Sequence, residues 1–160
     1  SDLILMAGLI LSLFSCKDNT TETATTEEHM HAASTSAQSE VPAMEAIPEG
    51  AKVYFKNLKE GDKIASPFKV EMGVDNMRVD TANGIILPAS GHHHILIGLD
   101  SVAAGTVVPK DSTHLHFGKA QTSAELVLQP GNYKLTLQFA DGLHRSYGGK
   151  MTQSVNVTVK

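Results

Sequence analysis

Apolar and polar residues alternate along several short stretches between residue 67 and the C-terminus, and this pattern limits the fold more than any other feature. The clearest examples are residues 67–75 (PFKVEMGVD), 132–140 (NYKLTLQFA) and 154–160 (SVNVTVK). Successive side chains of a β-strand point to opposite faces of a sheet. Each stretch therefore predicts a strand with one face on a core and the other face toward water.

Further strands are predicted at other short apolar stretches, which turn-forming residues separate. These candidates are residues 51–57, 92–98, 104–108 and 124–129. No stretch of this region has the spacing of an amphipathic helix. Seven or more short strands, each with one apolar face, predict an all-β fold, and we expect an immunoglobulin-like antiparallel β-sandwich over residues 48–160.

Tyr133 gives local support to this fold. It follows a Pro-Gly-Asn turn in LQPGNYKLTLQFADG and starts a late predicted strand. Immunoglobulin-like domains have a tyrosine at this corner, and its hydroxyl group binds neighbouring backbone. The alternative is a core residue with only its hydroxyl group in water.

The N-terminal part of the chain predicts export. Residues 3–14 form an apolar run, shorter than the roughly 20 residues that a membrane-spanning helix needs. The run has the length of a signal-peptide core, and the LFSC sequence that ends it resembles a bacterial lipobox. We therefore predict a signal-peptide segment over residues 1–15 and lipidation of Cys16. The alternative is an ordinary buried helix over this run.

A flexible linker is predicted to follow, so that residues 16–47 comprise the lipidated cysteine and this linker. Thr, Ser, Ala and Glu dominate here and large apolar residues are rare, so the segment cannot bury much surface. The expected location is the bacterial cell envelope, with a lipid anchor in a membrane and the domain facing the periplasm or the cell surface. His29 and His31 in this linker are either a weak site for a soft metal or a chance pair.

The composition excludes several kinds of site and partner. The chain has 13 Lys and Arg against 17 Asp and Glu, and this net charge of −4 at pH 7 does not suit a nucleic-acid-binding protein. Cys16 is the one cysteine, which excludes an internal disulfide and cysteine-rich zinc or iron–sulfur sites. The unusual residue is histidine, because five of the eight histidines fall within residues 90–97 and 113–118.

These two stretches read SGHHHILI and THLHFG. Residues two apart in a strand share a face. His92 and His94 therefore share a face opposite to that of His93, and His114 and His116 share a face in the second stretch. Apolar residues follow His93 in alternation, and others lie next to His114 and His116. These apolar residues are the natural core residues. We thus expect His93 toward the core and the other four outward.

If the two stretches are neighbours, their imidazoles can converge on one ion, since opposed residues of paired strands have Cβ atoms about 5 Å apart. We predict a metal site formed by His92, His94, His114 and His116, with His144 of ADGLHRSYGG assisting. Imidazoles without a thiolate suit copper, zinc or nickel, and we expect copper first and zinc as the alternative. A blue-copper site is excluded because it requires a cysteine ligand.

His93 and Asp141 are predicted to contact the metal ligands and to orient their rings. Asp100 and Asp111 are further carboxylates that can orient the rings. Two alternatives need no metal. In one, the histidines form a hydrogen-bonded network that holds loops together. In the other, they line a pocket for a metal-free ligand.

The chain resembles an uncharacterised family of bacterial exported domains. The matching stretches are VYFKNLKEGDKIASPFKVEMGV at 53–74, GHHHILI at 91–97, HLHFGKAQT at 114–122 and LQPGNYKLTLQFADGLH at 128–144. The resemblance implies export and a compact β domain, and makes the two histidine stretches features of the family. Related members often carry another histidine after the position of His144, where this chain has RSYGGK.

These features together predict a lipid-anchored envelope protein that binds a transition metal for capture or delivery, with no protein partner specified. The alternative is a non-catalytic interaction module of the cell envelope in which the histidines form a structural network. An enzyme with a metal-bound water is the third possibility. No His-Glu-x-x-His sequence, serine elbow or phosphate loop is present to support it.

Overall fold

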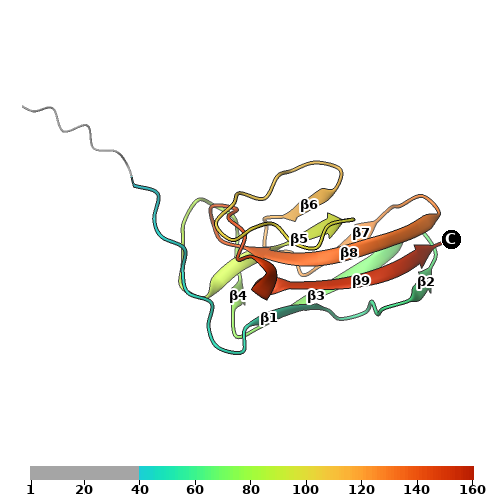
Figure 1. The fold of residues 1–160 in the computed structure, drawn as a ribbon, viewed down its shortest axis with the longest axis horizontal. Helices are drawn as coiled ribbons and strands as arrows, with labels where there is room; N and C mark the ends of the chain where they lie inside the picture. The colour runs from blue at the N-terminus through green and yellow to red at the C-terminus, as the bar shows by residue number, and fades with distance from the viewer. Residues whose placement is uncertain (1–39) are drawn as a thin grey trace, which may run out of the picture. The chain divides into compact units, whose positions relative to one another are not determined.

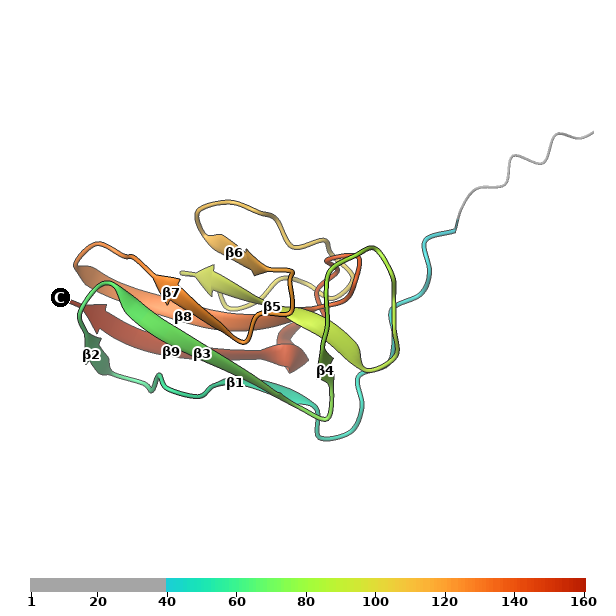
Figure 2. The ribbon, with the colours of Figure 1, turned by 180° about the vertical axis from the view of Figure 1, so that it is seen from behind.

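The computed structural model describes residues 40–160, which form two β-sheets packed face to face. Their elements are β1 (Lys52–Phe55), β2 (Asp62–Ile64), β3 (Phe68–Asp75), β4 (Arg78–Val79), β5 (Ser90–Ile97), β6 (His114–Phe117), β7 (Ser123–Leu126), β8 (Gly131–Ala140), the 3-10 turn η1 (Gly149–Met151) and β9 (Thr152–Val159). The larger sheet faces the viewer in Figure 1, and the smaller sheet is in front in Figure 2.

The predicted all-β sandwich is confirmed, and its strand order resembles that of immunoglobulin domains. The smaller sheet has the order β1-β3-β7, and the larger has the order β2-β9-β8-β5-β4 with β6 also paired to β5. The neighbours β5, β8 and β9 correspond to strands C, F and G of an immunoglobulin sandwich. Two short pairings, β2 with β9 and β4 with β5, run parallel, and the other pairings are antiparallel.

The core lies between the two sheets and consists of the residues that the alternation assigned to it. Phe68, Val70 and Met72 face it from β3, and Leu135, Leu137 and Phe139 face it from β8, all of them buried. Burying a side chain of this size contributes about 1.5–3 kcal/mol to the free energy of unfolding. The polar residues between them on β3 remain at least partly exposed.

Tyr133 forms the predicted corner. Its hydroxyl group donates a hydrogen bond to the backbone oxygen of Gln129 over 2.9 Å, four residues upstream and just before β8. This contact pins the turn that leads into β8. The C-terminal end of β8 pairs with the part of β5 that holds His92 and His94.

The strand predicted at 104–108 is wrong, because this segment is a loop between β5 and β6. Its backbone instead bonds to a second loop, residues 141–148, which follows β8. Gly105 donates to the Ser146 oxygen and Ser146 donates to the Thr106 oxygen, both over 2.9 Å. Apolar periodicity over five residues does not distinguish a strand within a sheet from a loop that pairs with another loop.

Residues 40–47, at the end of the predicted linker, lie against the sandwich. Met44 and Ile47 pack on the core, and the Arg145 side chain donates to the backbone oxygens of Pro42 and Ala43. The predicted signal segment, Cys16 and the pair His29 and His31 all lie outside the described residues. Within residues 40–160, no helix is long and apolar enough to cross a membrane.

Candidate metal centre

The two histidine stretches are neighbours in the larger sheet, on strands β5 and β6. His94 lies directly opposite His116 in their antiparallel pairing, so both side chains share one face of the sheet. His92 shares that face, two residues earlier on β5. The register therefore brings three imidazoles from two strands to one place on the outer face of the sandwich.

His92 and His94 are buried, although the sequence analysis placed them outward. They do lie on the outer face of the sheet, yet their exposed fractions are 0% and 1%. Loop 98–113 and loop 141–148 cover this face, where Val108 packs with Leu96 and Ala140 in a small second apolar cluster. The site is thus enclosed by loops on one side and by the sheet on the other.

The three side chains are close enough to hold one metal ion. His92, His94 and His116 each offer one ring nitrogen, and the three nitrogens lie within 4.8 Å of one another. The Nε2 atoms of His92 and His94 are 2.9 Å apart. His116 is only partly buried as a residue, although its Nε2 atom is buried.

His144 is next to this cluster, on the loop that follows β8. Its ring centre is 5.1 Å from that of His92, 4.8 Å from that of His116 and 6.5 Å from that of His94. The backbone of His144 is in the left-handed region, with φ of 65°. Residues other than glycine rarely adopt this conformation, and they do so most often at turns and functional sites.

Gly118 makes room for His116, and the sequence analysis did not single it out. A Cβ atom at position 118 would lie 2.3 Å from the Nε2 atom of His116, far inside van der Waals contact. Gly91 has a similar role between β5 and β8, where a Cβ atom would lie 2.3 Å from the Ala140 oxygen. The signal was present in the glycines that flank the histidines in GHHHILI and HLHFG.

The clustered imidazoles are held in the neutral form. Burial, followed by the repulsion of neighbouring imidazoles, lowers the pKa of His92 to about 3 and that of His94 to about 2. Burial also lowers the pKa of His116, and His144 adds to this effect. A neutral imidazole has a free lone pair, which is the state that binds a metal ion.

Several ring nitrogens of the cluster have no hydrogen-bond partner within residues 40–160. These buried atoms are Nδ1 of His92, Nδ1 of His94 and Nε2 of His116. A buried polar atom without a partner costs about 1–3 kcal/mol, so such groups are rare unless they have a function. The unpaired Nε2 atom of His116, with the adjacent Nε2 atoms of His92 and His94, therefore offers a donor set that fits a transition metal ion.

His114 lies apart from the other three. It is opposite Leu96 in the pairing of β5 with β6, and its Nδ1 atom is 2.8 Å from the Asp111 carboxylate. The His114 side chain and the Thr113 groups that bond to Asp111 lower the pKa of that carboxyl group to about 2. The contact ties the imidazole to the loop that precedes β6.

His93, Asp141 and Asp100 have other surroundings. His93 points into the core, where its ring packs edge-on against Phe139 at 5.1 Å, and burial lowers its pKa to about 4. Asp141 is buried and forms an ion pair with Arg145 over 2.8 Å. Asp100 forms an ion pair with Lys134 over 2.6 Å.

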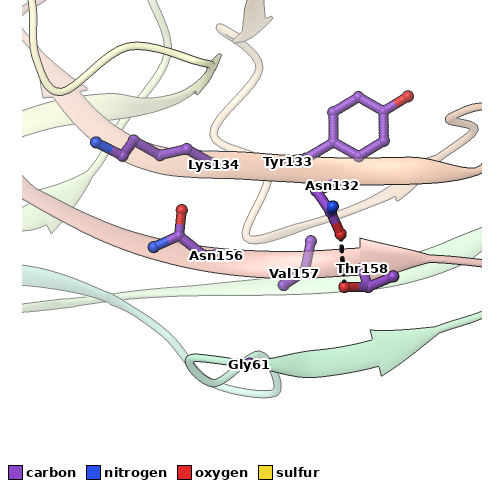
Figure 3. Close-up of a pocket in the computed structure, with 7 residues that line it drawn as sticks. All are labelled: Gly61, Asn132, Tyr133, Lys134, Asn156, Val157 and Thr158. Carbon is purple, nitrogen blue, oxygen red and sulfur yellow. Dashed lines mark hydrogen bonds between the residues drawn. The ribbon is translucent and has the colours of Figure 1, made fainter.

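A shallow pocket lies at the other end of β8 and β9, away from the histidines (Figure 3). Its lining includes Asn132, Lys134, Asn156 and Thr158, which alternate along the outer face of the two strands. These groups are already paired, for example Thr158 with Asn132 over 2.8 Å. The pocket therefore lacks the free, convergent groups that the histidine cluster has.

The fold and the site together define a class: an all-β sandwich with a buried cluster of neutral histidines on the outer face of its larger sheet. The chain belongs to the family described as a domain of unknown function (DUF4399), whose model matches residues 70–160. That range includes β5, β6 and the loop of His144, and therefore the whole cluster. Neither the curated proteins nor the solved structures gave a significant match.

Proposed function

We propose that this protein binds one transition metal ion through His92, His94 and His116, with His144 as a fourth ligand. The observation that carries the proposal is the convergence of three nitrogens within 4.8 Å on rings that are neutral. Neutral imidazole without thiolate suits copper and zinc, and copper has the higher intrinsic affinity.

The spacing of the rings is compatible with one bound ion. Nitrogens bound at 2.0–2.1 Å are about 2.9 Å apart when they subtend a right angle at the metal and about 3.3 Å apart in a tetrahedron. The two Nε2 atoms of His92 and His94 are 2.9 Å apart. Of the six distances between ring centres, five are 4.7–5.1 Å and one, between His94 and His144, is 6.5 Å.

A tetrahedral set of four imidazoles would have all six ring distances near 5 Å, and a square-planar set would have two near 6 Å. Five of the six distances match the tetrahedral set and one matches the longer distance of a square-planar set, so the ring positions suit either metal. We favour copper over zinc because copper has the higher intrinsic affinity for imidazole ligands. The role would be capture or delivery of the ion in the cell envelope, with Cys16 as the lipid anchor.

The test is metal stoichiometry of the purified full chain, with a matched pair of variants. Wild-type protein should hold one equivalent of copper after dialysis, and His116→Ala should lose it. His114→Ala is the control, because it removes a histidine of the same strand whose ring binds Asp111 instead. Absence of stoichiometric copper or zinc on wild-type protein would reject the proposal.

One contact favours a second function, a non-catalytic interaction module whose histidines form a structural network. The 2.9 Å separation between His92 and His94 also suits a hydrogen bond from one neutral ring to the other. In this arrangement, as in coordination through the two Nε2 atoms, the Nδ1 atoms of both rings stay buried and unpaired. Nitrogen NMR recorded before and after zinc is added separates the cases, because a network would keep the same tautomers.

A further inference from the structure

The loop that carries His144 is held in shape by Asp141. This carboxylate accepts hydrogen bonds from the backbone N–H groups of Leu143 and Arg145, each over 2.9 Å. The His144 N–H group donates to the Asp141 backbone oxygen over 2.9 Å. Together these contacts fix a tight turn in which His144 takes its left-handed conformation and sets its ring beside His92 and His116.

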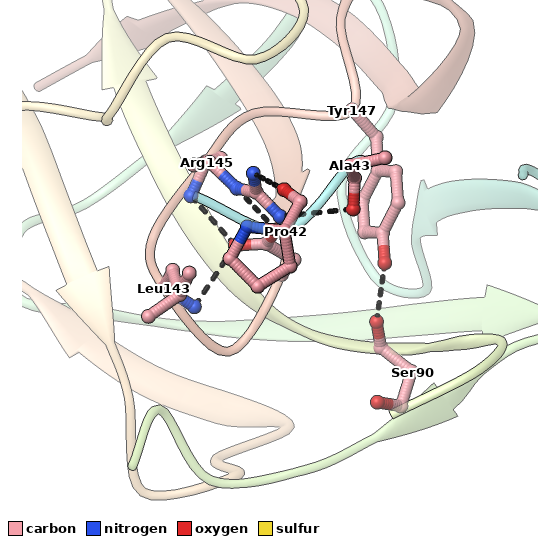
Figure 4. Close-up of polar contacts among 7 residues, drawn as sticks. Pro42, Ala43, Ser90, Leu143, Arg145 and Tyr147 are labelled. Atoms are coloured by element: carbon pink, nitrogen blue, oxygen red, sulfur yellow. Dashed lines mark hydrogen bonds and ion pairs between the residues drawn. The ribbon is translucent and has the colours of Figure 1, made fainter. Parts of the chain in front are cut away.

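Arg145 links this turn to a distant part of the chain. Its Nε atom donates to Asp141 over 2.8 Å, and the two residues are 7% and 1% exposed. Its remaining nitrogens donate to the backbone oxygens of Pro42 and Ala43, about one hundred residues earlier (Figure 4). A buried guanidinium needs partners for its N–H groups, and this one takes two of its three from the segment that precedes the sandwich.

Backbone contacts also support the turn, and the Asp141 N–H group closes it by donating to the Arg145 oxygen over 2.9 Å. Val108 donates to the His144 oxygen over 2.8 Å, and Gly84 donates to the Gly142 oxygen over 3.0 Å. None of these contacts involves a side chain. Asp141 and Arg145 supply the side-chain contacts that hold the turn of His144.

We propose that Arg145 is a positioning residue for His144, and that it couples the docking of residues 42–43 to the affinity of the metal centre. This inference rests on the proposed function. When the backbone oxygens of Pro42 and Ala43 accept hydrogen bonds from the guanidinium group, Arg145 and Asp141 hold the turn. The His144 ring then stays at the cluster. Coupling of this kind is reciprocal, so a bound ion also stabilises the docked segment.

Lysine cannot replace arginine in this role. A lysine at position 145 would keep a positive charge for Asp141. It lacks the planar fork that donates to the carboxylate and to two backbone oxygens at once. Arg145→Lys therefore keeps the charge of the loop and removes its link to residues 42–43.

The experiment compares copper affinity in the full chain for wild type, Arg145→Lys, His144→Ala and the double variant. We expect Arg145→Lys to weaken copper binding about 10–100-fold, the usual effect of losing a group that orients a ligand. Electron paramagnetic resonance should show one nitrogen ligand fewer. In the His144→Ala background the same substitution should have no further effect, because the residue acts through that histidine.

Tyr147→Phe is the matched control. Tyr147 is on the same loop and is buried, and its hydroxyl group donates to the Ser90 oxygen over 2.8 Å rather than to the backbone of residues 42–43. This variant should lower the stability of the fold and leave copper affinity unchanged. A general loosening of the loop would instead weaken binding in both Tyr147→Phe and Arg145→Lys, and that result would overturn the proposal.

Hydrogen exchange gives the reciprocal measurement. Copper should slow amide exchange of residues 40–47 in wild type and not in His144→Ala. Two results would overturn the coupling without contradicting the metal site. One is unchanged amide exchange in wild-type protein that does bind copper, and the other is equal copper affinity of Arg145→Lys and wild type. If wild type binds no metal, the proposed function fails and takes this inference with it.

Discussion

Acid should destabilise the metal-free domain strongly, because it buries three neutral histidines. The pKa values of His92, His93 and His94 in the fold are about 3, 4 and 2. In an unfolded chain each has a pKa of about 6.5. The unfolded chain therefore binds protons that the folded chain does not. The contribution of these histidines to the free energy of unfolding is fully present above pH 6.5. It is lost as the pH drops toward the folded pKa values.

The size of the effect follows from these values. Between pH 7 and pH 5, each histidine with such a shift lowers the free energy of unfolding by about 2 kcal/mol. Three of them together lower it by about 6 kcal/mol, on the order of the whole stability of a domain of this size. A carboxyl group with a lowered pKa, such as that of Asp111 at about 2, stays ionised throughout this range.

The assay is urea unfolding with a chelator present, followed by circular dichroism since the chain has no tryptophan. The free energy of unfolding should fall by about 6 kcal/mol between pH 7 and pH 5, or the domain should already be unfolded at pH 5. His92→Gln should reduce the fall by about 2 kcal/mol. A wild-type change below about 2 kcal/mol would show that the imidazoles are not buried neutral in this way.

Two further predictions concern packing. Gly118→Ala should abolish metal binding, because the added methyl group would lie 2.3 Å from the Nε2 atom of His116 and displace its ring. Metal titration measures this loss, and retention of full affinity would refute the prediction. Phe139→Ala should lower the free energy of unfolding by about 3–5 kcal/mol, since Phe139 is fully buried between the sheets and packs on His93. Denaturant unfolding at pH 7 measures that loss, and a change below about 1 kcal/mol would contradict the packing.

The period-two pattern was sufficient to predict much of the fold. Alternation along β3, β8 and β9 assigned the right residues to the core, because the face of a side chain within a strand depends only on whether its position is odd or even. It also predicted that His92 and His94 share a face opposite to that of His93. Tyr133 could be placed because the corner is local: its partner is four residues away.

The composition of the candidate site was decided by the tertiary structure. A pattern within one strand does not determine which strand is its neighbour or in what register. The pairing of β5 with β6 put His116 opposite His94 and put His114 opposite Leu96, beside Asp111. A shift of two residues would have kept every face and put His114 opposite His94 and His116 opposite His92.

Burial of the cluster also depends on contacts that no local pattern specifies. Loop 98–113 and loop 141–148 cover the outer face of β5 through bonds between residues some forty positions apart, such as Val108 with His144. The sequence by itself determined a sandwich with histidines on one outer face. Only the tertiary structure brought His92, His94, His116 and His144 together and buried the first two. Strand register and loop closure are long-range properties, set by the packing of the whole chain.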